Sequence, residues 1–201
     1  MIFAYNPLHV GDTLMVILED DKAMEQQVTR VDNVARINTS DNRVVGWNFF
    51  AISDELKITG NGQVKLTDEQ VTHLNQMMTK AGFSEQLAID HEPQFVVGFV
   101  ESCQPHPDSD HLSITMVDLK NKKVQIVCGA PNIRKGLKVV VAKPGTMMPD
   151  GSLIWPGELR GEKSDGMICS AKELQLANAP LKRGILELPQ ETEVGSEFPI
   201  N

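Results

Sequence analysis

Apolar and polar residues alternate differently in the two halves of the chain. In the first 60 residues, runs rich in Val, Ile and aromatic residues are separated by polar turn clusters, which predicts β-strands over 13–18, 28–37 and 44–52. A helix is then predicted, with Thr67 as its N-cap, Gln70 at capping-box spacing and Gly82 just beyond its end. A second short helical piece is expected over 85–89. The first domain is therefore a small α+β domain.

Beyond Gln94 the helical pattern fades and short apolar runs recur. These are FVVGFVESC, LSITMVDL, KVQIVCG, LKVVVA, GMICS and GILELP, with Gly, Pro or Asp clusters between them. Such spacing is typical of a small closed β-barrel, and about five strands in this length fit an OB-fold. We therefore expect two domains, an acidic α+β domain over 1–91 and an OB-fold β-barrel over 92–201.

Charge is divided unequally between these regions. The chain has a formal net charge of −8, but residues 1–90 hold 7 Lys and Arg against 13 Asp and Glu, whereas residues 118–183 hold 12 against 6. Because the local field steers a polyanion, the net charge does not exclude a nucleic-acid partner. Without a long apolar run or a secretory leader pattern, we expect a cytoplasmic protein with no membrane span.

The segment ELRGEKSDGMICSAKEL, residues 158–174, is typical of a loop that holds an anionic ligand. Arg160 and Lys163 supply charge, the glycines permit unusual backbone conformations, and Ser164 and Ser170 offer hydroxyl groups. A second loop, CGAPNIRKG over 128–136, carries Asn132, Arg134 and Lys135 between two strands. Phosphate contact or an ordinary solvated turn both explain this loop, which lacks the spacing of a P-loop.

Three other features have structural interpretations that compete with functional ones. HPDSDHL, residues 106–112, is either a metal site or a turn, and its Pro-Asp-Ser-Asp run favours the turn. Cys103, Cys128 and Cys169 lack CxxC spacing and are expected to be reduced and buried, although Cys128 beside the basic loop is a weak candidate nucleophile. The aromatic run at 47–50 is either core or a base-stacking surface. Strand alternation places Lys138 and Lys143 on opposite faces.

Three motifs together resemble one known module. HPDSDHL, QIVCGAPNIRKGLKVVVAKPG and LRGEKSDGMICSAKEL are similar to the tRNA-binding OB domain of the bacterial phenylalanyl-tRNA synthetase β subunit, bacterial methionyl-tRNA synthetase and endothelial monocyte-activating polypeptide, over roughly 94–198. Ser109 stands where many members of the family have alanine. The layout, an acidic N-terminal domain followed by this module alone, resembles the YtpR group of low-GC Gram-positive bacteria.

The resemblance implies tRNA binding in the cytoplasm without aminoacylation. We expect no catalysis, cofactor or metal, and recognition of the folded shape of the RNA rather than a base sequence. An alternative is a protein-interaction module in which residues 1–91 dock a partner and the OB domain is a retained scaffold. A third hypothesis, a hydrolytic or editing enzyme, depends only on scattered His and Cys residues. Relatives of this kind dimerise, so a homodimer is also possible. The candidate tRNA-binding residues are Asn132, Arg134, Lys135, Lys138, Arg160, Lys163, Ser164, Met167 and Ser170.

Overall fold

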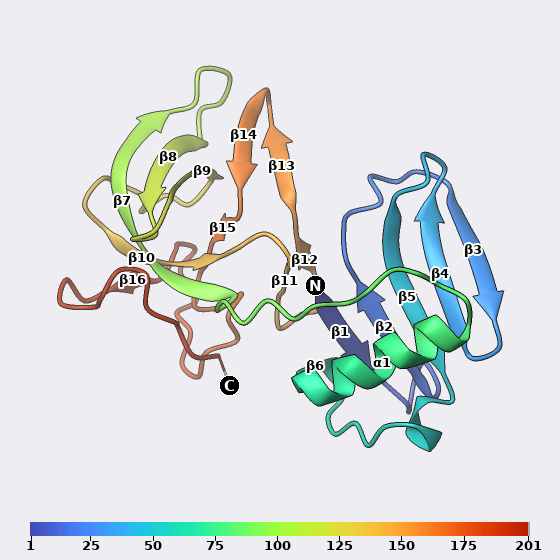
Figure 1. Cartoon of the computed structure of the whole chain (residues 1–201). Coiled ribbons are helices and arrows are strands. Elements are labelled where there is room, and N and C mark those ends of the chain that lie inside the picture. The colour runs from blue at the N-terminus through green and yellow to red at the C-terminus, as the bar shows by residue number, and fades with distance from the viewer. Residues whose placement is uncertain (201) are drawn as a thin grey trace. The chain divides into compact units, whose positions relative to one another are not determined.

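The computed structural model describes residues 1–200 and divides the chain into two compact units. The first unit is Met1–His91 and the second begins at Glu92. Both units consist mainly of β-strands, and the described chain contains one α-helix (Figure 1). The two-domain organisation expected from the sequence is therefore present, and each unit is described separately below.

The first unit is built on a six-stranded antiparallel sheet in the order β3-β4-β5-β2-β1-β6. Its strands are β1 (Ile2–Tyr5), β2 (Thr13–Ile17), β3 (Gln26–Val31), β4 (Val34–Thr39), β5 (Val44–Phe50) and β6 (Gly62–Val64).

The prediction of one strand over 28–37 is wrong. The chain reverses at Asp32 and Asn33 and forms a hairpin, with Asp32 at a φ of 50°. Asp tolerates this left-handed conformation better than most residues, so the Val-Asp-Asn-Val sequence was itself a turn signal.

Helix α1 (Asp68–Lys80) covers one face of this sheet (Figure 1). Both predicted caps are confirmed: the Thr67 hydroxyl accepts from the Gln70 amide, while the Gln70 side chain accepts from the Thr67 amide. At the other end Gly82 has a φ of 86°, and the amides of Gly82 and Phe83 donate to Thr79 and Met78. These two bonds satisfy carbonyls that the last turn would leave unpaired.

Loss of the N-cap should destabilise this unit. We expect Thr67→Ala to lower the free energy of unfolding by about 1 kcal/mol, because an amide of the first turn loses its acceptor. Urea unfolding followed by Trp47 emission in a Trp155→Phe background measures this. Thr59→Ala, at an exposed position without a hydrogen bond among the described residues, should change the midpoint little. Equal effects of the two substitutions would contradict the capping role.

The predicted helical piece over 85–89 does not form, which corrects that expectation. The segment is irregular, and its backbone is held by Asn75 of α1, whose side-chain amide donates to the Leu87 carbonyl and accepts from the Leu87 amide. A side chain thus replaces the helical hydrogen bonds that the segment lacks. Leu87 is buried against α1 as a result.

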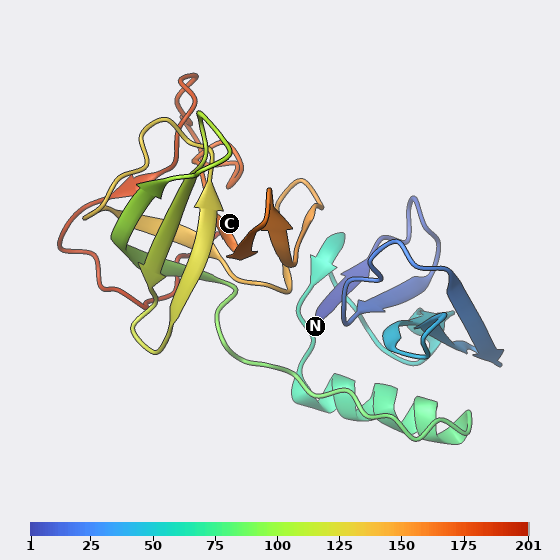
Figure 2. The same ribbon diagram turned by 90° about the horizontal axis from the view of Figure 1, so that it is seen from above.

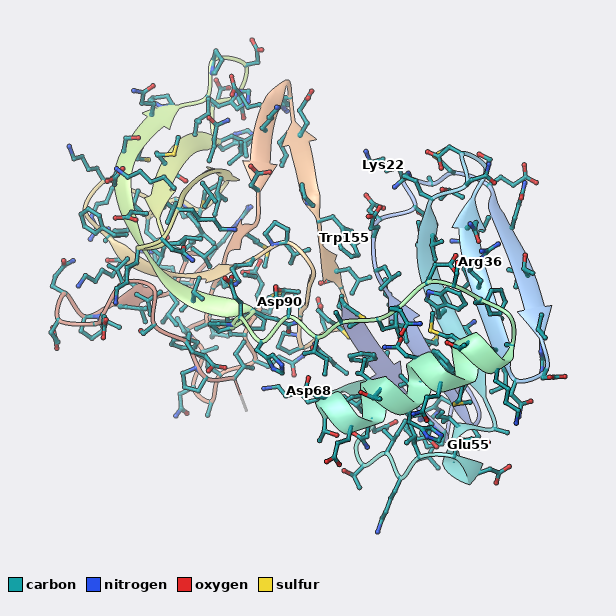
Figure 3. The ribbon with its side chains drawn as sticks, in the orientation of Figure 1. Lys22, Arg36, Glu55, Asp68, Asp90 and Trp155 are labelled. Carbon is teal, nitrogen blue, oxygen red and sulfur yellow. The ribbon has the colours of Figure 1, made fainter. Side chains whose placement is uncertain are left out.

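The aromatic run on β5 is part of the core, as the packing interpretation predicted. Trp47 and Phe49 are fully buried, and the Trp47 ring meets Phe83 edge to face at 4.9 Å. The guanidinium of Arg36 on β4, labelled in Figure 3, lies over the Phe83 ring at 5.4 Å and pairs with Glu85 at 2.8 Å. Phe50 lies on the opposite face, under the Arg30 guanidinium. These rings therefore stabilise the unit and are not a stacking surface.

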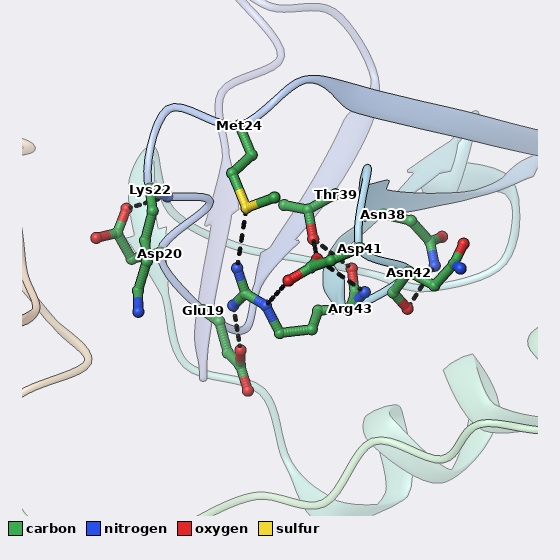
Figure 4. Close-up of polar contacts among 9 residues, drawn as sticks. All are labelled: Glu19, Asp20, Lys22, Met24, Asn38, Thr39, Asp41, Asn42 and Arg43. Carbon is green, nitrogen blue, oxygen red and sulfur yellow. Dashed lines mark hydrogen bonds and ion pairs between the residues drawn. The ribbon is translucent and has the colours of Figure 1, made fainter.

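The turn between β4 and β5 is closed by a network around Arg43 (Figure 4). Arg43 donates to Asp41 at 3.0 Å and to Glu19 at 3.1 Å. The Thr39 hydroxyl also donates to Asp41, and these bonds lower the pKa of the Asp41 carboxyl to about 2. The network is local to an exposed turn and contains no unpaired acid for chemistry.

The second unit is built on strands in the order β15-β10-β7-β8-β9, all antiparallel, with β16 also paired to β10. Its strands are β7 (Phe95–Pro105), β8 (Ser113–Asp118), β9 (Lys123–Cys128), β10 (Lys138–Ala142), β15 (Met167–Ile168) and β16 (Glu187–Leu188). Figure 2 shows the long strands curving together. Each of the six predicted apolar runs contains one of these strands.

Strand β10 separates two apolar clusters of this unit. Val139 and Val141 face the cluster of β7, β8 and β9, whereas Val140 and Ala142 face the C-terminal segments. The alternation predicted along this strand is therefore confirmed. Lys138 reaches the carbonyls of Gln190 and Thr192, and Lys143 pairs with Glu92 at 2.8 Å.

Two small hairpins were not expected from the sequence. β11 (Thr146–Met147) pairs with β12 (Leu153–Ile154), and β13 (Pro156–Leu159) pairs with β14 (Glu162–Asp165). Trp155, labelled in Figure 3, lies between these hairpins in the chain. All four residues of β13 are exposed, so the hairpin buries too little to show an apolar pattern.

Candidate nucleic-acid interface

The β13–β14 hairpin displays two of the predicted cations at its end. Its turn is Arg160–Gly161, with φ values of 49° and 86°, as expected for a two-residue turn with both central residues left-handed. Arg160 and Lys163 are exposed. Among the described residues, the Lys163 side chain has no hydrogen-bond or ion-pair partner. The hairpin therefore presents two exposed cations to solvent, beside the acidic side chains of Glu158, Glu162 and Asp165.

Side chains, rather than a strand ladder, attach this hairpin to β9. Ser164 is 5% exposed, and its hydroxyl accepts from the Val127 amide at 3.1 Å and donates to the Gly166 carbonyl at 3.4 Å. The Gln125 amide group donates to the Lys163 carbonyl at 2.9 Å and to Glu162. Ser164 thus holds the hairpin in place, and its hydroxyl is already occupied within the fold.

The HPDSDHL segment forms the predicted turn and joins the tip of the same hairpin. His106 is 3% exposed; its Nδ1 accepts from the Asp108 amide at 3.0 Å, so Nε2 carries the proton donated to the Leu159 carbonyl at 3.2 Å. Arg160 donates to the Asp108 carbonyl. Both ring nitrogens are occupied, so His106 does not act as a metal ligand. Residues 1–200 contain no group of three or more His, Cys, Asp or Glu able to hold a metal ion.

The CGAPNIRKG loop is fastened to the C-terminal part of the unit. The Asn132 side chain donates to the Ile185 carbonyl at 3.1 Å and accepts from the Ile185 amide at 2.9 Å. Arg134 forms a two-pronged pair with Glu187, at 3.0 and 2.8 Å. The hydrogen bonds from Arg134 and Asn132 lower the pKa of Glu187. Lys135 is exposed, and its side chain has no partner within residues 1–200.

Ser170 begins a tight turn that follows β15. Its hydroxyl donates to Glu173 at 2.6 Å and accepts from the Glu173 amide at 3.2 Å. The Glu173 carboxylate also accepts from the Ser170 amide, which completes a capping-box arrangement. This turn brings Lys172 to the surface beside Ser170.

A cleft of about 910 Å³ lies between this turn and two other segments. It is lined by residues 127–130 at the end of β9 and the start of the CGAPNIRKG loop, by residues 167–168, 170–173 and 175, by residues 180–185, and by Asp150. Lys172, Lys182 and Arg183 are exposed on its walls. Two of the predicted residues, Met167 and Ser170, therefore share a cavity with three further cations.

The nine predicted residues occupy separate parts of the unit. Arg160, Lys163 and Ser164 belong to the hairpin, Met167 and Ser170 to the cleft, and Asn132, Arg134 and Lys135 to the loop. Lys138 is held by Gln190 and Thr192.

The sequence reasoning did not select Lys172, Lys182 or Arg183 as site residues. Lys172 lies within the third motif, and Lys182 and Arg183 form a basic pair beside Gly184, but only the fold places them around one cavity.

Cys128 and Cys169 show no activation for nucleophilic chemistry. Burial raises the pKa of the Cys128 thiol, and burial raises that of Cys169 to about 12. Both groups are therefore protonated at neutral pH, and the weak nucleophile hypothesis for Cys128 gains no support.

Comparisons with known proteins assign each unit to a family. Residues 95–197 match a family described as "Putative tRNA binding domain", and residues 21–90 match "Domain of unknown function (DUF4479)". The chain is thus a two-domain protein with a tRNA-binding-type C-terminal domain. It is 44% identical to "Putative tRNA-binding protein YtpR" of Bacillus subtilis, over 96% of this chain and 97% of that protein. The chain belongs to the YtpR family.

Other relatives match only part of this chain. The phenylalanine–tRNA ligase β subunit of Oceanobacillus iheyensis is 45% identical over 60% of this chain and 16% of that subunit. The subunit of Rickettsia bellii is 42% identical over 66% of this chain and 15% of that subunit. A solved structure of a MetRS-related protein from Pyrococcus horikoshii covers 52% of this chain and 88% of its own, at 21% identity and a TM-score of 0.39.

Proposed function

We propose that this chain is a non-catalytic tRNA-binding protein that recognises folded tRNA through basic loops of its second unit. The observation that carries the proposal is the exposed hairpin end with Arg160 and Lys163, set in a domain of the tRNA-binding family. Phosphate and sugar contacts position an RNA without reading its bases, and cations on projecting loops suit that role. The alternative, a protein-interaction module that keeps the OB domain only as a scaffold, is not favoured. The relative that matches nearly the whole chain is named for tRNA binding.

The proposed contacts divide into two groups according to what their side chains do in the fold. Arg160, Lys163 and Lys135 are exposed and supply the attraction to phosphate, although Arg160 also donates to the Asp108 carbonyl. The bonded side chains hold the loops that carry these cations. This second group comprises Asn132, Arg134, Lys138, Ser164 and Ser170. Met167 contributes an apolar contact within the cleft.

We also infer an OB-fold barrel for the second unit. The strand order β15-β10-β7-β8-β9, together with the side-chain bonds between β9 and the β14 hairpin, supports a barrel whose two edges approach each other near Ser164. Projecting loops of such barrels bind oligonucleotides.

We infer further that the protein acts in the cytoplasm without a cofactor. No helix within residues 1–200 is long and apolar enough to span a membrane. The same proposal has two further parts. Residues 1–91 dock a protein partner, and the protein assembles as a homodimer. The loop between β1 and β2 supports the docking role, because Leu8 and Val10 are 82% and 52% exposed.

The salt dependence of tRNA affinity tests the proposed function. We expect the association constant for total tRNA to fall linearly with salt on a log–log plot, by about 0.7 to 0.9 per neutralised phosphate. Binding to an unstructured RNA of the same length should be weaker, because the loops recognise shape. Equal affinity for both RNAs would contradict shape recognition, and no binding at low salt would contradict the RNA role.

A further inference from the structure

The cleft beside β15 combines an apolar floor with cations that lack partners. Val127, Ala130, Ile168 and Ile185 contribute apolar surface to a cavity of about 910 Å³. Lys172, Lys182 and Arg183 are exposed on its walls, and their side chains form no hydrogen bond or ion pair with any described residue. The cleft thus offers apolar and positive surfaces to one ligand.

The two carboxylates that line the same cleft are already engaged. Glu173 accepts from the Ser170 amide and hydroxyl, and Asp150 accepts from the Ser152 amide and hydroxyl. The lining thus holds three cationic side chains against these two carboxylates, an excess of one positive charge, which favours a ligand with an anionic part. Leu181, next to Lys182, is fully exposed. Leu181 therefore adds an exposed apolar side chain to the lining of the cleft.

We propose that this cleft binds an unpaired nucleotide segment of the bound RNA. The bases lie against the apolar floor and the Arg183 guanidinium, and the phosphates lie at Lys182 and Lys172. A paired A-form helix exposes phosphates and 2′-hydroxyl groups but no base faces, so it makes no use of an apolar floor. Unpaired bases splay out and stack on arginine planes as well as on aromatic rings. The volume falls within the usual range of small-ligand sites, so at least one nucleotide fits.

This inference rests on the proposed function and adds a second element to it. The hairpin with Arg160 and Lys163 recognises the folded backbone, whereas the cleft recognises nucleotides that are not paired. Different side chains carry the two contacts, because neither Arg160 nor Lys163 lines the cleft. They are therefore separable by mutation.

The experiment compares two RNA hairpins with the same stem, one blunt and one with an unpaired 3′ extension. The wild-type protein should bind the extended hairpin more tightly. The double substitution Lys182→Ala and Arg183→Ala should abolish that preference. It should also reduce the log–log salt slope for the extended RNA by about 0.7, the value of one phosphate on a single strand, because Lys182 contacts a phosphate whereas Arg183 stacks on a base. Lys57→Ala with Lys122→Ala removes the same charge from exposed positions outside the cleft and should preserve the preference.

The outcomes separate this inference from the proposed function. Wild-type binding to tRNA without any preference for the extended hairpin would overturn the cleft proposal while the proposed function stands. Retention of the preference in the cleft variant, or its equal loss in the control, would also overturn it. Binding of free AMP in the cleft without the RNA preference would identify a mononucleotide site instead. Failure of the wild-type protein to bind tRNA at low salt would contradict the proposed function itself.

Discussion

Replacing Asn132 with alanine is expected to lower the free energy of unfolding of the second unit by about 2 to 6 kcal/mol. The Asn132 side chain pairs with both the amide and the carbonyl of Ile185, and Ile185 is 7% exposed. Each buried backbone group that loses its partner costs about 1 to 3 kcal/mol, because water cannot replace the lost bond there. The substitution therefore removes more than the net value of two hydrogen bonds.

The same substitution should also weaken RNA binding. Asn132 and Arg134 both donate hydrogen bonds to Glu187. Loss of the Asn132 side chain should therefore loosen the CGAPNIRKG loop, which carries Lys135. Amide hydrogen exchange at Ile185 and β16 should accelerate in the variant, and tRNA affinity should fall. Asn121→Ala, at an exposed turn position without a hydrogen bond among the described residues, is the matched control. Unchanged exchange at Ile185 in Asn132→Ala would show that the amide does not hold this connection.

The strands that bury side chains could be predicted from the sequence. The sequence runs that form β7 to β10 alternate or cluster apolar residues because these strands enclose the core. The caps of α1 were also predictable, because they depend only on residues within one turn of the helix. The β13–β14 hairpin could not be predicted in the same way, since all of β13 is exposed and only Ser164 of β14 is buried. The strand predicted over 28–37 failed because apolar content was given more weight than the turn signal at Asp32 and Asn33.

The candidate site was predictable as a set of motifs but not as a geometry. The three motifs identified the loops, yet a side chain's chemistry does not reveal whether the fold already uses it. Ser164 and Asn132 are suitable RNA ligands by type, but both are bonded within the protein. Conversely, Lys172 and Arg183 lie 11 residues apart in the sequence, and only the cleft brings them to one surface. Long-range pairing decides both cases, and a local pattern does not contain it.

A graded effect is expected from alanine substitutions at three glycines of the hairpin segment. Gly157→Ala should be nearly neutral, because a Cβ there has no atom within 4 Å and the backbone is not left-handed. Gly161→Ala should cost about 1 to 2 kcal/mol through its φ of 86° alone, since the surrounding space is open. Gly166→Ala should cost about 3 kcal/mol or more, because it combines a φ of 117° with a Cβ only 2.7 Å from the Ala142 carbonyl oxygen.

Gly166 has the largest expected effect because its neighbour is backbone rather than a flexible side chain. Relief of the clash requires β15 to move away from β10, where Ala142 pairs with Met167. The shift would also disturb the Gly166 carbonyl that Ser164 bonds, and hence the attachment of the hairpin to β9. Thermal unfolding should rank the variants Gly157→Ala, Gly161→Ala and Gly166→Ala in order of falling stability. A Gly166→Ala protein as stable as the Gly157→Ala protein would show that β15 is not fixed against β10. If RNA affinity falls in the same order as stability, the hairpin must be held in place for the protein to bind RNA.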